Sequence, residues 1–302
     1  MQQHDDDHDQ GFVYDLKVMA AMVERRRALK WFAGAGTAAL VASCGGGGSS
    51  DAVTVVTGTT PTPTPTSTST ATPIPTPTAT SGTTACIADP AETAGPYPAD
   101  GTNSASGSTS NSLTVTGIVR SDIRPSFISG TTVATGVQLV LTLTLVDVNA
   151  SCAPLAGYAL YLWHCDRSGN YSLYTAAAES YLRGVQVTNA AGQVTFTTIF
   201  PACYDGRFPH IHLEIFPSLS AATTGRAASL VTQIYPPRDV CTAVYNGATG
   251  YSTSVTNLAR VTLASDNVFG DNSAAQVAQM AMVMSGSVST GYTATNTIGI
   301  AR

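Results

Sequence analysis

The segment from Phe208 to Phe216 places the strongest constraint on how this chain can fold. It reads Phe-Pro-His-Ile-His-Leu-Glu-Ile-Phe, so polar and apolar side chains alternate after the proline. In a β-strand, successive side chains point to opposite faces. The two isoleucines and the leucine therefore face a core, whereas His210 and His212 share the other face with Glu214 behind them. Neutral imidazoles on one face of a rigid strand are good ligands for a transition metal.

Similar short runs recur from residue 86 onward, separated by Gly, Asn, Asp and Pro. We expect strands in Leu113–Val119, Val137–Val148, Tyr158–Trp163, Gln193–Thr198, His210–Phe216 and Leu230–Tyr235, and a short helix or a strand in Ala274–Met284. Many short strands with turn residues between them predict an all-β fold with a β-sandwich core. Two long connections, Ser121–Ala134 and Ala176–Arg183, are expected to be active-site loops.

The composition divides the chain into three parts. Residues 1–43 contain a polar tail and an export signal, residues 44–85 form a Gly/Ser and Thr/Pro-rich linker, and residues 86–302 contain the β-sandwich domain. The first 85 residues have no plausible core. Thr57–Thr84 is Thr, Pro and Ser in near-alternation, which favours an extended, disordered stalk.

The export signal consists of Arg25–Lys30 and the apolar run Trp31–Val41. This run is too short to span a membrane and fits a signal peptide. The paired arginines resemble a twin-arginine signal, with Ala28 where phenylalanine is usual. Val41-Ala42-Ser43-Cys44 resembles a bacterial lipobox, so we favour an exported lipoprotein anchored in the cell envelope at Cys44. The alternative is ordinary signal cleavage with an incidental cysteine.

Charged residues are scarce, at 11% of the chain. From Cys86 onward there is no lysine, and nine Arg stand against twelve Asp plus Glu. This mild acidity predicts that the domain has no nucleic-acid partner. An anionic substrate would have to be recognised by single arginines, for which Arg124, Arg167 and Arg183 are candidates.

Five cysteines follow Cys44. An exported protein tends to oxidise its cysteines, and an odd number leaves at least one free or paired between molecules. Our hypothesis is a bridge between Cys152 and Cys165, because they flank one predicted strand and loop.

Three histidines follow the export signal, namely His164, His210 and His212. A His-x-His pair alone is more often solvated or structural, but here Tyr204 and Arg207 precede it, and Tyr171 follows an earlier strand. A tyrosine binds metal as a phenolate only where a strong Lewis acid stabilises the anion, and ferric iron is the natural candidate. Alternatively, the tyrosines are ordinary residues at strand ends, each with a buried ring and a hydroxyl in contact with water.

The pieces Glu92–Tyr97, Leu162–Tyr171, Leu182–Gly184, Phe196–Pro201, Gly206–His212 and Thr232–Tyr235 occur in the order seen in intradiol ring-cleavage dioxygenases. From about Glu92 to its C-terminus the chain resembles this family of protocatechuate and catechol dioxygenases, and most of all its small exported members. The resemblance implies a non-haem Fe(III) ligated by Tyr171, Tyr204, His210 and His212. It also implies that Arg207 lies beside the substrate ring, that Gln233 lines the site and that Tyr97 packs over the entrance.

The function implied by the resemblance is intradiol cleavage of a catechol-type aromatic diol by O2, which gives a cis,cis-muconate-type product. Tyr204 would leave the metal to accept a substrate proton, as a general base. The chain departs from the family at Tyr161, where an acidic residue is usual, and at Ala202-Cys203, where a Gly-Trp or similar pair is frequent. These positions support the ligands or shape the pocket.

Two other functions stay open at this point. One is a cupin-like metal enzyme that uses His210 and His212 with His164 or Glu214 and needs no tyrosinate. The other is a non-enzymatic surface binding domain with a degenerate site.

Overall fold

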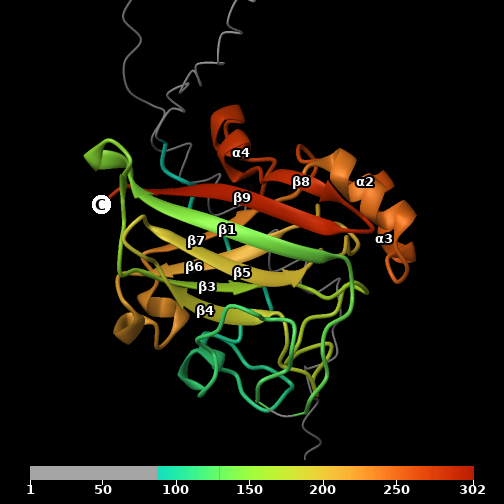
Figure 1. Cartoon of the computed structure of the whole chain (residues 1–302), viewed down its shortest axis with the longest axis horizontal. Coiled ribbons are helices and arrows are strands. Elements are labelled where there is room, and N and C mark those ends of the chain that lie inside the picture. Colours follow the sequence, from blue (N-terminus) through green and yellow to red (C-terminus); the bar gives the residue numbers. More distant parts are fainter. Residues whose placement is uncertain (1–86, 129) are drawn as a thin grey trace, which may run out of the picture. The chain divides into compact units, whose positions relative to one another are not determined.

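The computed structural model describes residues 87–128 and 130–302. The predicted tail, signal peptide, lipid-modified Cys44 and linker lie outside the described residues. Within the described ranges, two β-sheets pack against each other (Figure 1). No helix in these ranges is long and apolar enough to cross a bilayer.

The first sheet is built around two ten-residue strands. Its order is β2 (Ala153–Pro154), β1 (Gln138–Asp147), β9 (Gly291–Ile300) and β8 (Val283–Ser287), and β5 (Gln193–Ile199) also pairs with β1. β1 runs parallel to β9 and antiparallel to β5. The second sheet is antiparallel throughout, in the order β4 (Arg183–Val187), β3 (Ala159–Trp163), β6 (Ile211–Phe216) and β7 (Leu230–Ile234).

The main core fills the space between the sheets. Alternation sends Leu139, Leu141, Leu143 and Leu145 of β1 inward, and it does the same for Ile211, Leu213 and Ile215 of β6; all seven side chains are fully buried. This is the face that the alternating pattern of residues 208–216 predicts. Because the isoleucines and the leucine of β6 face the other sheet, His212 of β6 and His210 just before it are left to the opposite side.

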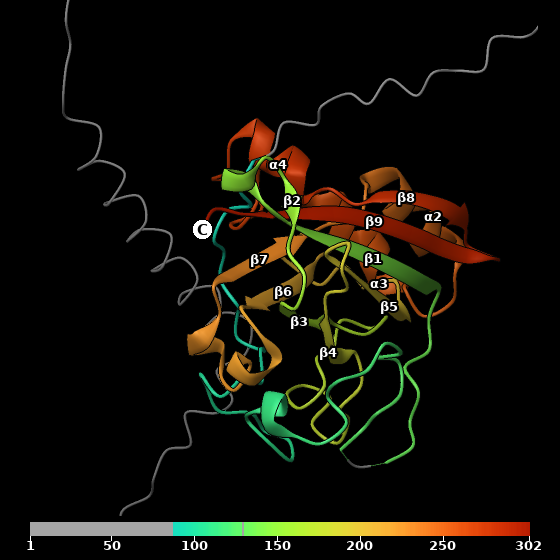
Figure 2. The ribbon, with the colours of Figure 1, turned by 60° about the vertical axis from the view of Figure 1, so that its left-hand side comes forward.

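The outer face of the second sheet is also covered, but by loops. Side chains from residues 99–127 and 171–174 form a second apolar cluster with Tyr161, Trp163 and Val185. In Figures 1 and 2, the segment before β1 lies beneath β3 and β4. Four strand partners form one row across this covered face, in the order Arg183, Trp163, His212 and Gln233.

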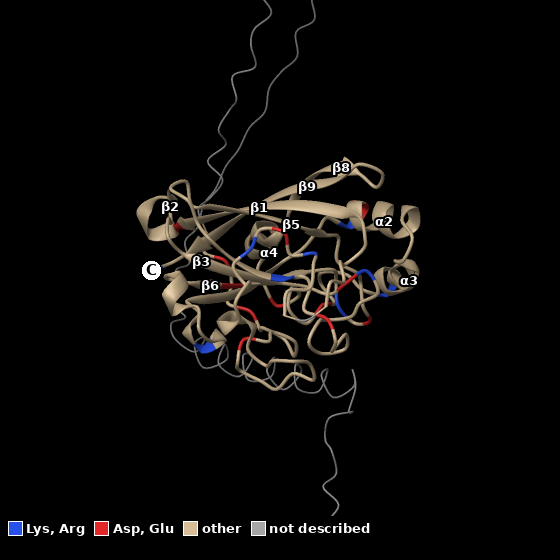
Figure 3. Ribbon diagram, turned by 60° about the horizontal axis from the view of Figure 1, so that its bottom comes forward, with Lys and Arg blue, Asp and Glu red and all other residues tan. Residues whose placement is uncertain are grey.

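The outer face of the first sheet is uncharged and rich in hydroxyl groups. Thr142 of β1 contacts Thr195 of β5 through their hydroxyls at 2.9 Å, and Ser285 contacts Thr293 across β8 and β9 at the same distance. Figure 3 shows β8 and β9 without a charged residue along their whole length. Threonine suits such a face because its branched side chain has a high strand preference and pairs across strands.

Helices occupy the C-terminal third of the chain. They are α2 (Arg238–Gly247), α3 (Ser252–Arg260) and α4 (Ala274–Met280), and single 3-10 turns cover Ser112–Thr114, Val148–Ala150, Leu219–Ala221 and Gly225–Ala227. A capping box formed by Ser273 and Gln276 starts α4. The predicted region Ala274–Met284 thus divides into a helix and the beginning of β8.

Most predicted strands are confirmed, namely those that became β1, β3, β5, β6 and β7. The prediction for Leu113–Val119 is wrong. The Asn111 side chain accepts the Leu113 N–H and starts a 3-10 turn, and Gly117 at φ +95° reverses the chain. Strands β4 and β9 were not predicted. β9 alternates between buried and exposed positions, but the small Ala294 and the polar Asn296 among its buried residues weaken the apolar pattern.

The predicted bridge between Cys152 and Cys165 is also wrong. Cys152 is disulfide-bonded, but not to Cys165, because Cys165, Cys203 and Cys241 are free and buried. The Cys165 thiol points at the Ala202 carbonyl, 3.7 Å away. Burial raises the pKa of this thiol, so it behaves as a small apolar group rather than as a nucleophile.

Asp89 ties the start of the described chain to β9. Its N–H donates to the Gly299 carbonyl at 2.9 Å, and its carboxyl accepts the Gly299 N–H at 2.7 Å. Burial raises the pKa of Asp89 to about 7, against the lowering effect of hydrogen bonds from Gly299 and Gln279. The protonated form is thus favoured in the folded state, and this contribution to stability is lost as the pH rises from about 4 through 7.

In the wild-type protein, Asp89 should lower the free energy of unfolding by on the order of 4 kcal/mol between pH 4 and pH 8. We expect Asp89→Asn to abolish this decrease. Urea unfolding curves of both proteins at several pH values measure this difference. Equal slopes of unfolding free energy against pH in the two proteins would contradict the assignment.

Candidate metal centre

Two imidazoles and two phenols converge at the outer face of the second sheet. Nε2 of His210 lies 3.1 Å from Nε2 of His212 and 3.1 Å from the Tyr204 hydroxyl. The Tyr171 hydroxyl lies 3.4 Å from Nε2 of His210 and 3.3 Å from Nε2 of His212. The structure thus brings together all four residues that the sequence singled out as iron ligands.

The histidines are oriented by the backbone and by an indole. His210 precedes β6, and its Nδ1–H donates to the Phe208 carbonyl at 2.6 Å. This bond fixes the tautomer in which Nε2 carries a free lone pair. His212 stacks on its strand partner Trp163, with ring centroids 4.8 Å apart and planes within 4°. Gly95, at φ +71°, lies against the edge of the same imidazole, where a Cβ would be 3.3 Å away.

One tight turn positions both tyrosines. The Asp166 carboxylate accepts the backbone N–H groups of Ser168 and Asn170, so that the chain re-enters the site at Tyr171. Gly169 in this turn packs on Tyr204, because a Cβ at Gly169 would lie 3.3 Å from the Tyr204 Cβ. The turn therefore presents one tyrosine and supports the other.

Tyr97 covers this arrangement, as the sequence predicted. Its ring centroid lies 4.9 Å from that of Tyr171 and 5.1 Å from that of Tyr174. These tilted aromatic contacts hold the segment before β1 over the site.

The spacing of the four donor atoms fits a metal ion. Donors that each sit about 2.1 Å from one cation are roughly 3.0–3.4 Å apart in octahedral or tetrahedral geometry. The four measured separations, 3.1 to 3.4 Å, fall in this range. Two nitrogen and two phenolic oxygen donors suit a hard, highly charged ion such as Fe(III), with neutral and anionic ligands in equal number.

The pKa values of the four residues agree with this donor set. Burial, followed by the charge of Arg207, lowers the pKa of His210 far below its usual value, and burial does the same for His212. Both imidazoles are therefore neutral. Burial raises the pKa of Tyr204 to about 12 and that of Tyr171 well above 10. Only a bound cation would hold these phenols as phenolates at neutral pH.

Arg207 is held at the rim of the site by a buried ion pair. Its Nε donates to Asp266 at 2.9 Å, and both side chains are at most 1% exposed. A second guanidinium nitrogen donates to the Gln233 side-chain oxygen at 2.7 Å, and Gln233 donates to the Thr93 carbonyl at 2.9 Å. Burial lowers the pKa of Arg207, but the charge and hydrogen bond of Asp266 together with Tyr204 and Tyr171 outweigh it and leave the pKa above the ordinary value.

Asp266 was missed by sequence reasoning. It lies 59 residues from Arg207, in a loop after α3, and no motif marks it. Its carboxylate also accepts the N–H groups of Phe208, Val268 and Phe269. The only available signal was an isolated acid in an otherwise uncharged stretch, which is not specific.

The departure at Tyr161 is explained by Arg183. This arginine is 1% exposed and donates to the Tyr161 hydroxyl, the Ser172 side chain and three backbone carbonyls. The Tyr161 hydroxyl in turn donates to the Pro98 carbonyl at 2.7 Å. Neutral oxygens thus bind the Arg183 guanidinium. Arg183 is therefore a structural residue, and the prediction that it could recognise an anionic substrate is wrong.

The second departure from the family pattern, Ala202-Cys203, does not disrupt the site either. The Cys203 N–H donates to Ser254 of α3, and its thiol lies 3.5 Å from the Arg207 carbonyl. Cys203 therefore supports the loop that carries Tyr204 and Arg207.

The third ligand required by the cupin-like alternative is not in place. Both ring nitrogens of His164 are engaged, by the Cys165 carbonyl and by Thr198, and burial lowers its pKa to about 4. Glu214 is fully buried in the next row of the sheet, beside Tyr161, where burial and the nearby Asp100 raise its pKa. Among residues 87–128 and 130–302, no three His, Cys, Asp or Glu side chains form a metal-binding group.

Comparison with known proteins agrees with this geometry. Residues 127–244 match the model of a protein family described as "Dioxygenase". The fold is similar to that of an intradiol ring-cleavage dioxygenase from Tetranychus urticae, with a TM-score of 0.54 and 25% identity over 72% of this chain and 95% of the other. The chain therefore resembles the intradiol ring-cleavage dioxygenases both in this family match and in its fold.

The matched dioxygenases are oxidoreductases, and the protein is an enzyme of this class. A 3-chlorocatechol 1,2-dioxygenase from Rhodococcus opacus 1CP also matches, with a TM-score of 0.43 and 17% identity over 71% of this chain and 72% of the other. No curated protein sequence matches the chain.

Proposed function

We propose that this dioxygenase uses O2 to open a catechol-type aromatic diol between its two hydroxyl-bearing carbons, at a non-haem Fe(III) held by Tyr171, Tyr204, His210 and His212. The product would be a cis,cis-muconate-type dicarboxylate. The observation that supports this most directly is the convergence of two phenols and two neutral imidazoles, in which four donor-to-donor separations are 3.1 to 3.4 Å.

The bound Fe(III) would withdraw electron density from the diol, which makes the ring reactive toward O2. The chain itself supplies proton transfer. Tyr204 is the better base of the two tyrosines, because it is partly exposed whereas Tyr171 is 1% exposed and packed under Tyr97. A phenolate at Tyr204 would accept a hydroxyl proton from the substrate.

Arg207 supplies a fixed positive charge. Its guanidinium lowers the pKa values of Tyr204, His210 and His212, so its field reaches the ligands. Asp266 and Gln233 hold the Arg207 guanidinium in place. The guanidinium therefore does not have to move when negative charge develops on the substrate ring. Gln233 acts here by holding Arg207, and its position in the row beside His212 keeps it at the wall of the site.

Export and anchoring belong to the same proposal. Residues 1–43 would direct export, Cys44 would carry the lipid, and residues 44–85 would hold the enzyme domain away from the envelope. The aromatic diol would then be cleaved outside the cytoplasm.

The test is the iron content and the visible spectrum of the purified protein, before and after anaerobic addition of catechol. We expect about one iron per chain and a tyrosinate-to-iron band that shifts with catechol. His212→Ala should lower iron affinity by on the order of a hundredfold or more and abolish the band, because even residues that only support metal ligands contribute 10- to 100-fold.

Two other results would overturn the proposal. A colourless protein that holds another metal would favour the cupin-like site, and a protein that cannot be loaded with metal would favour a binding module. His164→Asn is the matched control for His212→Ala, because His164 is buried and yet turned away from the four donors.

A further inference from the structure

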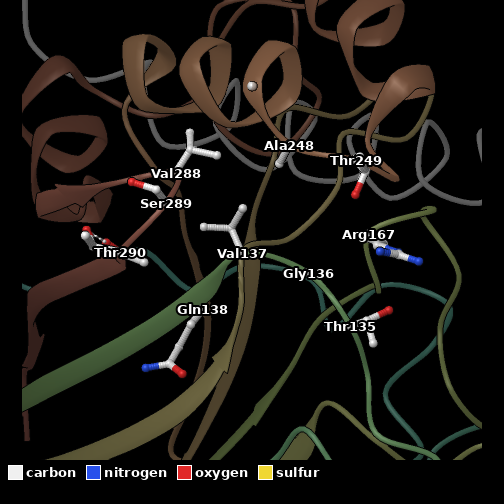
Figure 4. Close-up of a pocket in the computed structure, with 12 residues that line it drawn as sticks. Thr135, Gly136, Val137, Gln138, Arg167, Ala248, Thr249, Val288, Ser289 and Thr290 are labelled. Atoms are coloured by element: carbon white, nitrogen blue, oxygen red, sulfur yellow. Dashed lines mark hydrogen bonds between the residues drawn. The ribbon is translucent and has the colours of Figure 1, made fainter.

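We propose that a pocket beside Arg167 binds a small hydroxylated carboxylate, such as a sugar acid, outside the metal centre. The pocket has a volume of about 670 Å³ and lies where the start of β1, the turn between β8 and β9 and the loop after α2 meet (Figure 4). Its polar lining consists of Thr135, Gln138, Arg167, Thr249, Ser289 and Thr290. This volume is typical of small-molecule sites.

Arg167 differs from the other arginines of the domain. Six of the nine described arginines have carboxylate, carbonyl or hydroxyl partners, namely Arg120, Arg124, Arg183, Arg207, Arg238 and Arg302. Arg226 and Arg260 are exposed to solvent. Arg167 alone is partly buried without a hydrogen bond or ion pair to any described residue. A partly desolvated guanidinium without a partner favours an anion.

The Arg167 side chain is held along one wall of the pocket. Gly250 has φ +91°, and a Cβ there would lie 2.6 Å from both Cδ and Nε of Arg167. The side chain therefore rests directly on this glycine. The neighbouring Asp166 does not neutralise it by contact, because its carboxylate accepts Ser168 N–H, Asn170 N–H and the Tyr181 hydroxyl.

The rest of the lining defines the ligand. Figure 4 shows Thr135 and Thr249 on either side of Arg167, with Ser289 and Thr290 at the far end. None of the twelve lining residues is acidic. A guanidinium binds a carboxylate with two parallel hydrogen bonds, and the hydroxyls of the threonines and serine match hydroxyl groups on the ligand. Because the volume far exceeds one carboxylate, the body of the ligand extends toward Ser289.

This pocket is separate from the metal centre. The turn of residues 166–170 lies between them: its Gly169 packs on Tyr204, whereas its Arg167 lines the pocket. No metal-centre residue is among the twelve that line the pocket. The inference therefore goes beyond the proposed ring cleavage and does not depend on it.

The experiment is isothermal titration of the full-length protein with D-glucuronate and with D-glucose, which has a similar ring but no carboxylate. We expect glucuronate to bind metal-free and iron-loaded protein equally, and glucose to bind at least about tenfold more weakly. Arg167→Gln should weaken glucuronate binding about tenfold or more, whereas Arg260→Gln, at an exposed arginine, should leave it unchanged.

Thr249→Val tests the site without touching the charge, and it should weaken glucuronate binding severalfold. The proposal is wrong if wild-type protein does not bind glucuronate, if Arg167→Gln binds it as wild type does, or if iron loading or catechol abolishes the binding. The last outcome would place the ligand at the metal centre instead.

Discussion

Tyr204→Phe is expected to lower kcat by about 10²- to 10⁴-fold while iron stays bound, because the variant keeps three ligands but loses the base that accepts the substrate proton. The Tyr204 hydroxyl is 3.1 Å from Nε2 of His210, and the ring contacts the site edge-on. Loss of one phenolate should also weaken the visible band and shift its maximum. Iron analysis, the spectrum and steady-state kinetics on catechol measure the three effects.

The matched control is Tyr235→Phe, since the Tyr235 hydroxyl donates to the Val277 carbonyl away from the metal centre. That variant should retain the band and the activity. An unchanged spectrum in Tyr204→Phe would show that Tyr204 is not a ligand. A variant with a changed spectrum and full turnover would show that another group accepts the proton.

Arg207→Met is expected to cost about 3–5 kcal/mol of unfolding free energy as well as activity, because it leaves the Asp266 charge buried without its partner. Both side chains of this pair are at most 1% exposed. A loss of iron in this variant would thus report unfolding as well as chemistry. Chemical denaturation separates the two, and kcat of the folded fraction should fall by about 10²- to 10³-fold.

A double variant, Arg207→Met with Asp266→Leu, removes both charges. We expect it to regain most of the lost stability but none of the activity, since replacing a whole buried pair by apolar residues is often neutral. Arg124→Met is the control, because the Arg124–Asp122 pair is 31% and 43% exposed and should contribute less than about 1 kcal/mol. If Arg207→Met is as stable and as active as wild type, Arg207 neither stabilises the fold through Asp266 nor contributes to catalysis.

The local pattern around His210 and His212 was enough to predict their strand, its buried face and their convergence. Alternation is a property of neighbouring residues, so it can be read without a structure. The positions of Tyr171 and Tyr204 followed from order along the chain, by resemblance. In contrast, the Arg207–Asp266 pair joins residues 59 apart, and the Gln233 bond to Thr93 joins residues 140 apart. Contacts of this range depend on packing that no local pattern encodes.

The same reason explains the wrong disulfide and the missed role of Arg183. Nearness in sequence suggested Cys165 as the partner of Cys152, but Cys165, just after β3, is buried with its thiol toward the Ala202 carbonyl. Arg183 looked free for substrate, yet the carbonyls that bind it come from residues 97, 98 and 172. Its role depends on a loop that folds back over the sheet.

The row of Arg183, Trp163, His212 and Gln233 ties the proposed iron site to strand pairing, because the register of β6 decides which way His212 points. A slip of β6 by one residue against β3 and β7 would turn Ile211 and Leu213 outward and send both imidazoles into the sandwich. Such a chain could remain compact and rich in β-structure. If the proposed iron site is right, such a chain would lack the visible band of the native protein although its circular dichroism still indicated β-structure.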